Sequence, residues 1–169
     1  YVGTGIFTEV VITRHTCNDI AGRYKFNFKT GFKNTFFKKY AQMHTRSYRN
    51  LPVAFYRPLE WWNNIRQNAK YKIKNDEFVN VIYKSSLIGY FVYRDNKVIE
   101  AACFPKTGDV FCKAILQYLD LWLKKSFPEV SITLSLEHAC SKYYRTLNNT
   151  IKIRRVWNGG HLIRIIDKE

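Results

Sequence analysis

The sequence is poor in acidic residues and cysteine, and it has no long hydrophobic run. Only 13 Asp and Glu stand against 28 Lys and Arg, which gives a formal net charge of +15. No run of eighteen apolar residues is present, so we expect no membrane span. The first residues also lack the basic start and the small-residue cleavage site of a secretory signal.

Four cysteines (Cys17, Cys103, Cys112 and Cys140) form no CxxC pair, and the four histidines are isolated from one another. The sequence therefore predicts neither a metal site nor a disulfide framework. It favours thiols in a reducing, intracellular compartment.

The shortage of acid is concentrated in one part of the chain. Residues 20–59 carry nine Lys and Arg and no Asp or Glu. Such a span predicts an anionic partner, either RNA or an acidic protein surface. Its candidate contacts alternate with Tyr and Phe, and they are Arg23, Lys25, Lys29, Lys33, Lys38 and Lys39.

A second interpretation of this span stays open, in which the rings belong to the core and the lysines form a solvated helix face. No RNP motif, KH loop or other dedicated nucleic-acid signature decides between the two.

Apolar material is abundant, at 46% hydrophobic and 17% aromatic residues, so the charge does not indicate disorder. A chain of 169 residues can bury a core, and we expect one domain over 1–169. The chain does not begin with Met, so a fragment of a longer protein stays open, as does membership of an oligomer or larger assembly.

Hydrophobic periodicity and turn residues predict an ordered series of elements. We expect a strand over Val2–Arg14 and an irregular connection over Cys17–Gly31. Two helices (about 32–48 and 58–69), three strands (Phe78–Lys84, Leu87–Arg94 and Lys97–Phe104) and a long helix (about 108–126) follow. The series ends with a strand (Val130–Leu136), a short helix (Ala139–Leu147) and a hairpin (Ile151–Asp167) that turns at Asn158-Gly159-Gly160. The order β-α-α-β-β-β-α-β-α-β-β predicts an α+β fold with a mostly antiparallel sheet flanked by helices.

This order resembles the GNAT superfamily of acyl-CoA-dependent N-acyltransferases over essentially the full length. Many members carry Asn-x-x-Ala-x-x-Leu-Tyr around the second-to-last helix. The corresponding residues here are Glu137, Cys140, Tyr143 and Tyr144, of which Tyr144 matches directly.

A narrower resemblance is to the second, degenerate GNAT domain of proteins of the "enhanced intracellular survival" type. It rests on Arg57…Trp62, Gly89-Tyr90…Tyr93-Arg94, Ile99-Glu100-Ala101 and Arg164-Ile165-Ile166-Asp167.

The GNAT resemblance implies a splayed sheet and transfer of an acetyl group from acetyl-CoA to an amine. In that family the middle strand and the turn after it hold the cofactor, a carboxylate takes the amine proton, and a tyrosine protonates the leaving thiolate. Carried over to this sequence, the catalytic pair is Glu100 and Tyr144. The cofactor-binding residues are Ala101, Ala102, Cys103, Lys106, Thr107 and Gly108.

The turn departs from the family pattern Arg/Gln-x-x-Gly-x-Gly/Ala. Residues 104–110 contain one glycine, and Asp109 stands where the diphosphate would come. A like charge within a few ångströms opposes binding by about 1–4 kcal/mol. Three functions therefore stay open: an acetyltransferase, a non-catalytic basic GNAT-fold subunit of a larger assembly, and a nucleic-acid-binding module that uses residues 20–59.

Overall fold

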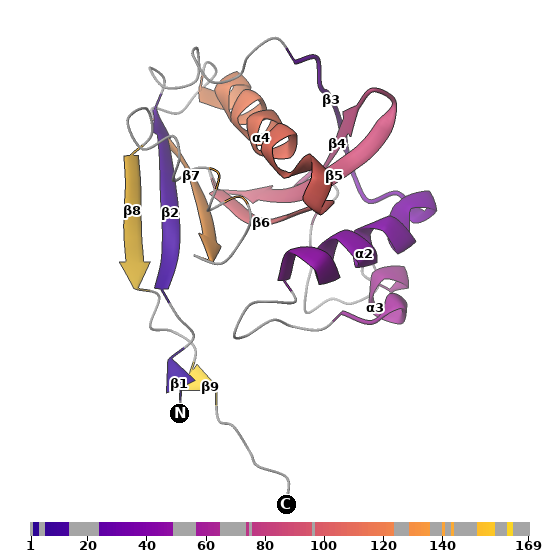
Figure 1. Cartoon of the computed structure of the whole chain (residues 1–169), viewed down its shortest axis with the longest axis horizontal. Coiled ribbons are helices and arrows are strands. Elements are labelled where there is room, and N and C mark those ends of the chain that lie inside the picture. Colours follow the sequence, from indigo (N-terminus) through magenta and orange to yellow (C-terminus); the bar gives the residue numbers. More distant parts are fainter. Residues whose placement is uncertain are drawn as a thin grey trace, which may run out of the picture.

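The computed structural model describes residues 2–3, 6–13, 24–48, 57–64, 74, 76–95, 97–123, 129–135, 140, 143, 152–157 and 162–163. Its main feature is a seven-stranded sheet in the order β3-β4-β5-β6-β7-β2-β8 (Figure 1). These strands are β2 (Ile6–Thr13), β3 (Asn27–Thr30), β4 (Phe78–Tyr83), β5 (Ser86–Arg94), β6 (Lys97–Cys103), β7 (Glu129–Ser135) and β8 (Lys152–Trp157). All neighbours are antiparallel except β6 and β7, which are parallel. The predicted α+β class with a mostly antiparallel sheet is confirmed.

Tight turns join the three central strands. Lys84 and Ser85 connect β4 to β5 with positive φ angles of 47° and 63°, the backbone that a two-residue hairpin requires. Asp95, with φ of 47°, begins the turn into β6, as its Asp-Asn sequence predicts. The register between β4 and β5 shifts beside Gly89, which pairs with Val81.

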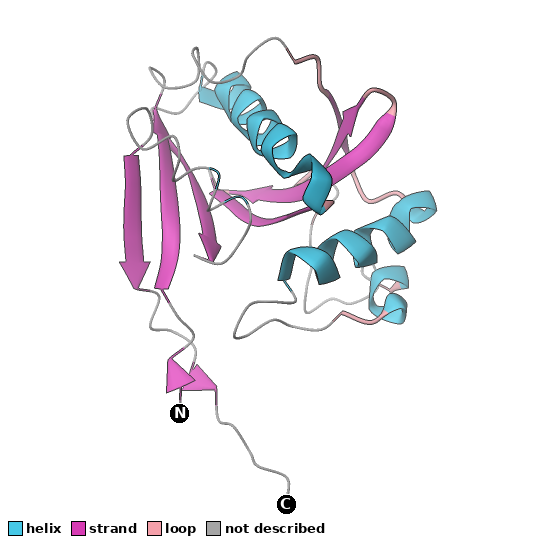
Figure 2. Ribbon diagram, viewed as in Figure 1, coloured by secondary structure: helices cyan, strands magenta, loops and turns pink. Residues whose placement is uncertain are grey.

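Helices cover both faces of the central strands (Figure 2). Helix α4 (Gly108–Leu123) lies on one face, and α2 (Phe37–Tyr48) and α3 (Leu59–Asn63) lie on the other. A one-turn 3-10 helix, Asn34–Phe36, leads into α2. These positions agree with the helices predicted near 32–48, 58–69 and 108–126, as far as the described residues extend.

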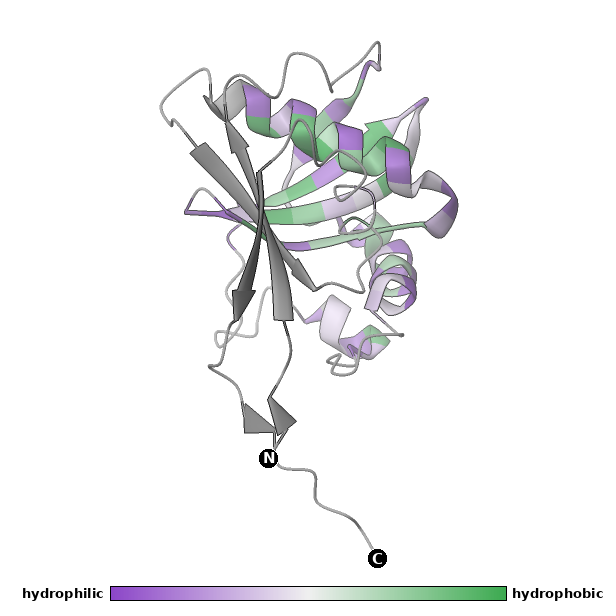
Figure 3. Ribbon diagram, turned by 60° about the vertical axis from the view of Figure 1, so that its left-hand side comes forward, coloured by the Kyte–Doolittle hydropathy of each residue, from purple (hydrophilic) through white to green (hydrophobic). Residues whose placement is uncertain are grey.

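Each face has its own core, because successive strand residues point to opposite sides. The α4 core contains Phe91 and Phe111, whereas Tyr40, Trp62 and Tyr90 lie in the core under α2 and α3. Figure 3 shows hydrophobic strands between helices whose outward sides are hydrophilic. Within the described residues, no helix is both long and apolar enough to cross a membrane. No cluster of three or more potential metal-ligating side chains occurs there either.

Two predictions about the ends of the chain are wrong. The span Cys17–Gly31 contains a strand, β3, which pairs with β4 and forms an edge of the sheet. Within the described residues, the two strands predicted to close the chain as a hairpin share no ladder. Instead β8 pairs with β2, and β9 (Leu162–Ile163) pairs with β1 (Val2–Gly3) in a small separate sheet. Strands β1 and β2 of the N-terminal segment therefore pair with β9 and β8, which the hairpin pattern had predicted to pair with each other.

Candidate functional site

The parallel strands β6 and β7 separate soon after they meet. Their pairing is confined to Lys97 with Ser131 and Val98 with Ile132. From Glu100 to Cys103, strand β6 pairs with β5 on one side but has no described ladder partner on the other. This opening is the splay that the family resemblance implies, and it leaves backbone groups of β6 available for other partners.

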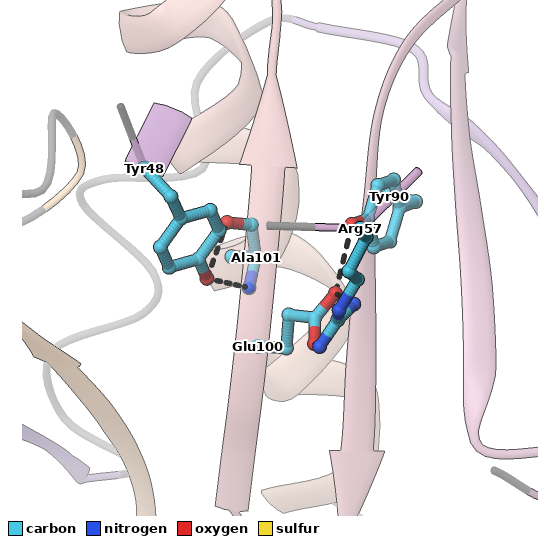
Figure 4. A network of polar contacts seen from close by, with 5 residues as sticks. All are labelled: Tyr48, Arg57, Tyr90, Glu100 and Ala101. Atoms are coloured by element: carbon cyan, nitrogen blue, oxygen red, sulfur yellow. Dashed lines mark hydrogen bonds and ion pairs between the residues drawn. The ribbon is translucent and has the colours of Figure 1, made fainter. Parts of the chain in front are cut away.

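Two hydroxyl groups from the end of α2 occupy those backbone groups. The Tyr48 hydroxyl donates to the carbonyl of Ala101 at 3.0 Å and accepts from the Ala101 N–H at 3.3 Å (Figure 4). The Ser47 hydroxyl donates to the carbonyl of Cys103 at 3.3 Å and accepts from the Cys103 N–H at 3.2 Å. Burial, reinforced by the charge of Glu100, raises the pKa of Tyr48, so its proton stays available for donation. We call Ser47 and Tyr48 together the α2 cap.

The turn from β6 into α4 also uses its polar groups internally. Pro105 has no N–H, the Thr107 N–H donates to the Phe104 carbonyl at 2.9 Å, and the Gly108 N–H donates to the Pro105 carbonyl. The Thr107 hydroxyl lies 2.9 Å from the Phe104 carbonyl oxygen and 3.2 Å from that of Ile88. Asp109 follows, exposed to solvent in the first turn of α4.

Glu100 is held by an arginine and a tyrosine. Arg57 donates to both carboxylate oxygens at 2.7 Å, and the Tyr90 hydroxyl donates to one of them at 2.8 Å (Figure 4). The guanidinium carbon of Arg57 lies 4.4 Å from the ring centroid of Trp61, within cation–π range. Burial would raise the pKa of Glu100, but the charge and hydrogen bonds of Arg57 outweigh it, so the net pKa is lowered. Glu100 therefore lies here as a carboxylate with its proton-accepting oxygens occupied.

The described members of the predicted contact set for an anionic partner lie on and beside β3 and at the start of α2. Lys25, Lys29, Lys33, Lys38 and Lys39 are all exposed. The ion pairs among the described residues use Arg57 and Arg94 and none of these lysines. Arg23 and Tyr144 lie outside the described residues, so the structure does not place them.

Comparisons with known proteins agree with this architecture. A crystal structure of a GCN5-related N-acetyltransferase from Kribbella flavida matches with a TM-score of 0.51 and 9% identity. The chain has a GNAT-like fold. A functionally unknown conserved protein from Staphylococcus epidermidis matches with a TM-score of 0.58, also at 9% identity.

The matches cover 90% and 89% of this chain but only 36% and 58% of the respective neighbours. At this identity they show the fold alone. No protein-family model and no curated protein sequence matches the chain.

The GNAT-like fold implies acetyl-CoA, and the described residues do not fit that cofactor. Ala101, Ala102, Cys103, Lys106, Thr107 and Gly108 follow one another along β6 and into α4, as predicted. A cofactor held there would need N–H and C=O groups with free capacity along the strand and at the helix start. The α2 cap and the turn already use such groups at Ala101, Cys103, Thr107 and Gly108.

Sequence reasoning found Glu100 but missed the side chains that determine its surroundings. Arg57 and Tyr90 stood in the pieces quoted for the narrower resemblance, and the structure brings those pieces together around Glu100. A buried carboxylate needs a compensating charge, which is a reason to search distant segments for an arginine. Ser47 and Tyr48 carried no such signal, since they read as the last residues of a helix.

Proposed function

We propose that this chain is a GNAT-fold domain that acts as a non-catalytic, basic subunit of a larger assembly. The observation that supports this most directly is the α2 cap, which occupies the splayed edge of β6 at Ala101 and Cys103.

Exchanging the hydrogen bonds of the α2 cap for hydrogen bonds to a cofactor would yield little net free energy. A typical intramolecular hydrogen bond contributes about 0.5–1.5 kcal/mol net. A cofactor entering the splay would have to replace the bonds to Ser47 and Tyr48 with its own, so this edge would contribute little net binding energy. Displacement would also leave the part-buried hydroxyls in need of new partners.

The surroundings of Glu100 support the same proposal. A general base works best when its pKa lies near the working pH. Arg57 holds the pKa of Glu100 below the ordinary value of 4.5, and its hydrogen bonds occupy both oxygens. An acetyltransferase with Glu100 as base and Tyr144 as acid remains the rival hypothesis. Resemblance to a degenerate second GNAT domain accords with the non-catalytic one.

A titration with acetyl-CoA, monitored by the NMR chemical shifts of the backbone amides, tests the proposal. For the native sequence we expect no saturable shift at Ala101 or Cys103 with about 1 mM ligand. In a Ser47→Ala/Tyr48→Phe double variant, the amides of Ala101 and Cys103 should exchange with solvent about tenfold faster, because each loses a hydrogen-bond acceptor. Thr45→Ala is the matched control, since Thr45 is an exposed residue of the same helix.

Saturable shifts at Ala101 and Cys103 in the native protein would contradict the proposal and restore the acetyltransferase. Shifts confined to the exposed lysines would mean only that the phosphates of the ligand meet a basic surface. Reading the position of the shifts separates the two outcomes.

A further inference from the structure

Five exposed lysines lie on and beside β3 and in the first turn of α2, and none of them forms an ion pair with a described carboxylate. We call Lys25, Lys29, Lys33, Lys38 and Lys39 the lysine face. Residues 24–48 contain no Asp or Glu, and Arg46 adds a further exposed cation. These six cations give residues 24–48 a formal charge of +6, out of a net charge of +15 for the whole chain.

A buried asparagine fixes the backbone from which these lysines project. The Asn80 side chain donates to the carbonyls of Lys29 at 2.9 Å and Gly31 at 2.8 Å. It also accepts a 2.6 Å hydrogen bond from the Tyr40 hydroxyl, which in turn accepts from the Lys33 N–H at 3.3 Å. Strand β3 and the start of α2 are thereby joined at one point in the core. The lysine face is built on a fixed scaffold.

The position of the cations opposes the stability of the helix itself. Lys38 and Lys39 lie in the first turn of α2, which has no acidic residue. Positive charge at a helix N-terminus opposes the helix dipole and is unfavourable. A bound anion would offset this cost and the mutual repulsion of the lysines.

The neighbouring residues indicate which kind of anion fits. Exposed large hydrophobic side chains among the described residues are Leu59 and Ile99, both outside the lysine face. An anionic membrane surface or a protein partner usually requires apolar anchors beside the charge. The phenylalanine rings of residues 26–37 and the ring of Tyr40 are buried or half-buried against the two cores, and Tyr24 stacks on Phe26 with 5.7 Å between ring centroids. These rings are therefore engaged within the chain rather than presented for base stacking.

We propose that the lysine face binds the phosphodiester backbone of a nucleic acid, without reading its sequence. Lysine ammonium groups would replace counterions along the phosphates, which makes the affinity strongly dependent on salt. This binding does not depend on whether the splayed edge of β6 can accept a cofactor.

Fluorescence anisotropy with two labelled 20-base-pair duplexes of unrelated sequence tests the inference. We expect similar affinities for both, and a slope of about −3 to −5 for log K against log salt concentration, from roughly 0.9 per phosphate contact. Lys33→Glu and Lys38→Glu should each lower the affinity about tenfold at 50 mM salt and reduce the slope by about one.

Lys97→Glu is the matched control, because it makes the same charge change at an exposed lysine on β6. It should change the affinity less than about twofold, since β6 lies three strands from β3 in the sheet and an exposed charge at that separation is screened. Circular dichroism verifies that each variant is folded. Three results would overturn the inference: no binding at 50 mM salt, equal losses from Lys97→Glu and Lys33→Glu, or binding to vesicles rich in phosphatidylserine but not to the duplexes.

Discussion

Glu100 is a largely buried carboxylate whose charge Arg57 compensates through two hydrogen bonds of 2.7 Å. Replacing Arg57 with Met would keep most of the apolar contact with Trp61 but leave the carboxylate uncompensated. We expect a loss of about 3–5 kcal/mol in the free energy of unfolding at pH 7. Urea denaturation measures it. The control is Arg94→Met, which breaks a more exposed pair with Glu77 and should cost about 0–1 kcal/mol.

The cost of Arg57→Met should also depend on pH. In the native protein the lowered pKa of Glu100 means that its stabilising contribution is present above pH 4.5 and is lost as the pH falls through the lowered value. Without Arg57, burial raises the pKa of Glu100, so protonation relieves the variant as the pH falls. The difference in stability between the two proteins should therefore shrink between pH 7 and pH 4. A difference that stays constant would show that Arg57 acts through packing alone.

At this scale the sequence could identify Glu100 but not its state. A carboxylate in a predicted strand reads equally as a general base, a surface residue or a buried ion. Arg57 lies 43 residues earlier, and nothing local couples the two positions. The same limit applies to Ser47 and Tyr48, which lie 56 and 53 residues before their partners.

At the scale of elements, Gly89 and Gly108 differ in the space available for a side chain. A Cβ at Gly89 on β5 would lie too close to the Phe111 ring of α4 and 2.8 Å from the Ala102 carbonyl oxygen. At Gly108, the first residue of α4, nothing lies within 4 Å of an added Cβ.

We expect Gly89→Ala to destabilise the fold by about 1–3 kcal/mol, because helix and strand must separate. Gly108→Ala should stabilise it by about 0.4–1 kcal/mol, since its backbone is already helical. Thermal and urea denaturation of the two variants, compared with the native protein, measure both effects. Equal destabilisation by the two substitutions would contradict the close packing of β5 against α4.

Helix α2 shows how far local patterns reach. The spacing of Phe36, Tyr40 and Met43 predicts its buried side, and Tyr40 and Met43 are indeed fully buried. The prediction of an irregular connection over Cys17–Gly31 overlooks the alternation of Tyr24, Phe26 and Phe28 with polar residues, which is the period of a strand. Pairing with β4 gives this alternation one half-buried side and one exposed side, since Phe28 packs against the α4 core and Lys29 is exposed.

At the scale of the whole molecule, the N-terminal segment supplies β2, the strand next to one edge of the sheet. Strand β2 pairs with β7 on one side and β8 on the other, whereas the pairing of β1 that the described residues show is with β9 in the small sheet. Removing residues 1–5 should leave the seven-stranded sheet intact and change Tm by only a few degrees. Removing residues 1–13 takes a strand from between two neighbours, so we expect the cooperative transition to be lost.

Circular dichroism melting and size-exclusion chromatography distinguish the two truncations. A cooperative melt after removal of residues 1–13 would show that β7 and β8 can pair without β2.

Local periodicity, turn residues and charge were sufficient to predict the class of the fold, the helices over the described residues, the three central strands and an unneutralised basic span. These depend on neighbours within a few positions, which a sequence displays directly. Only the folded chain decided that β2 lies between β7 and β8, that Arg57 neutralises Glu100, and that Ser47 and Tyr48 occupy the splayed edge of β6. Each of these contacts joins residues more than forty positions apart, where the packing of the two cores, and not local preference, selects the partner.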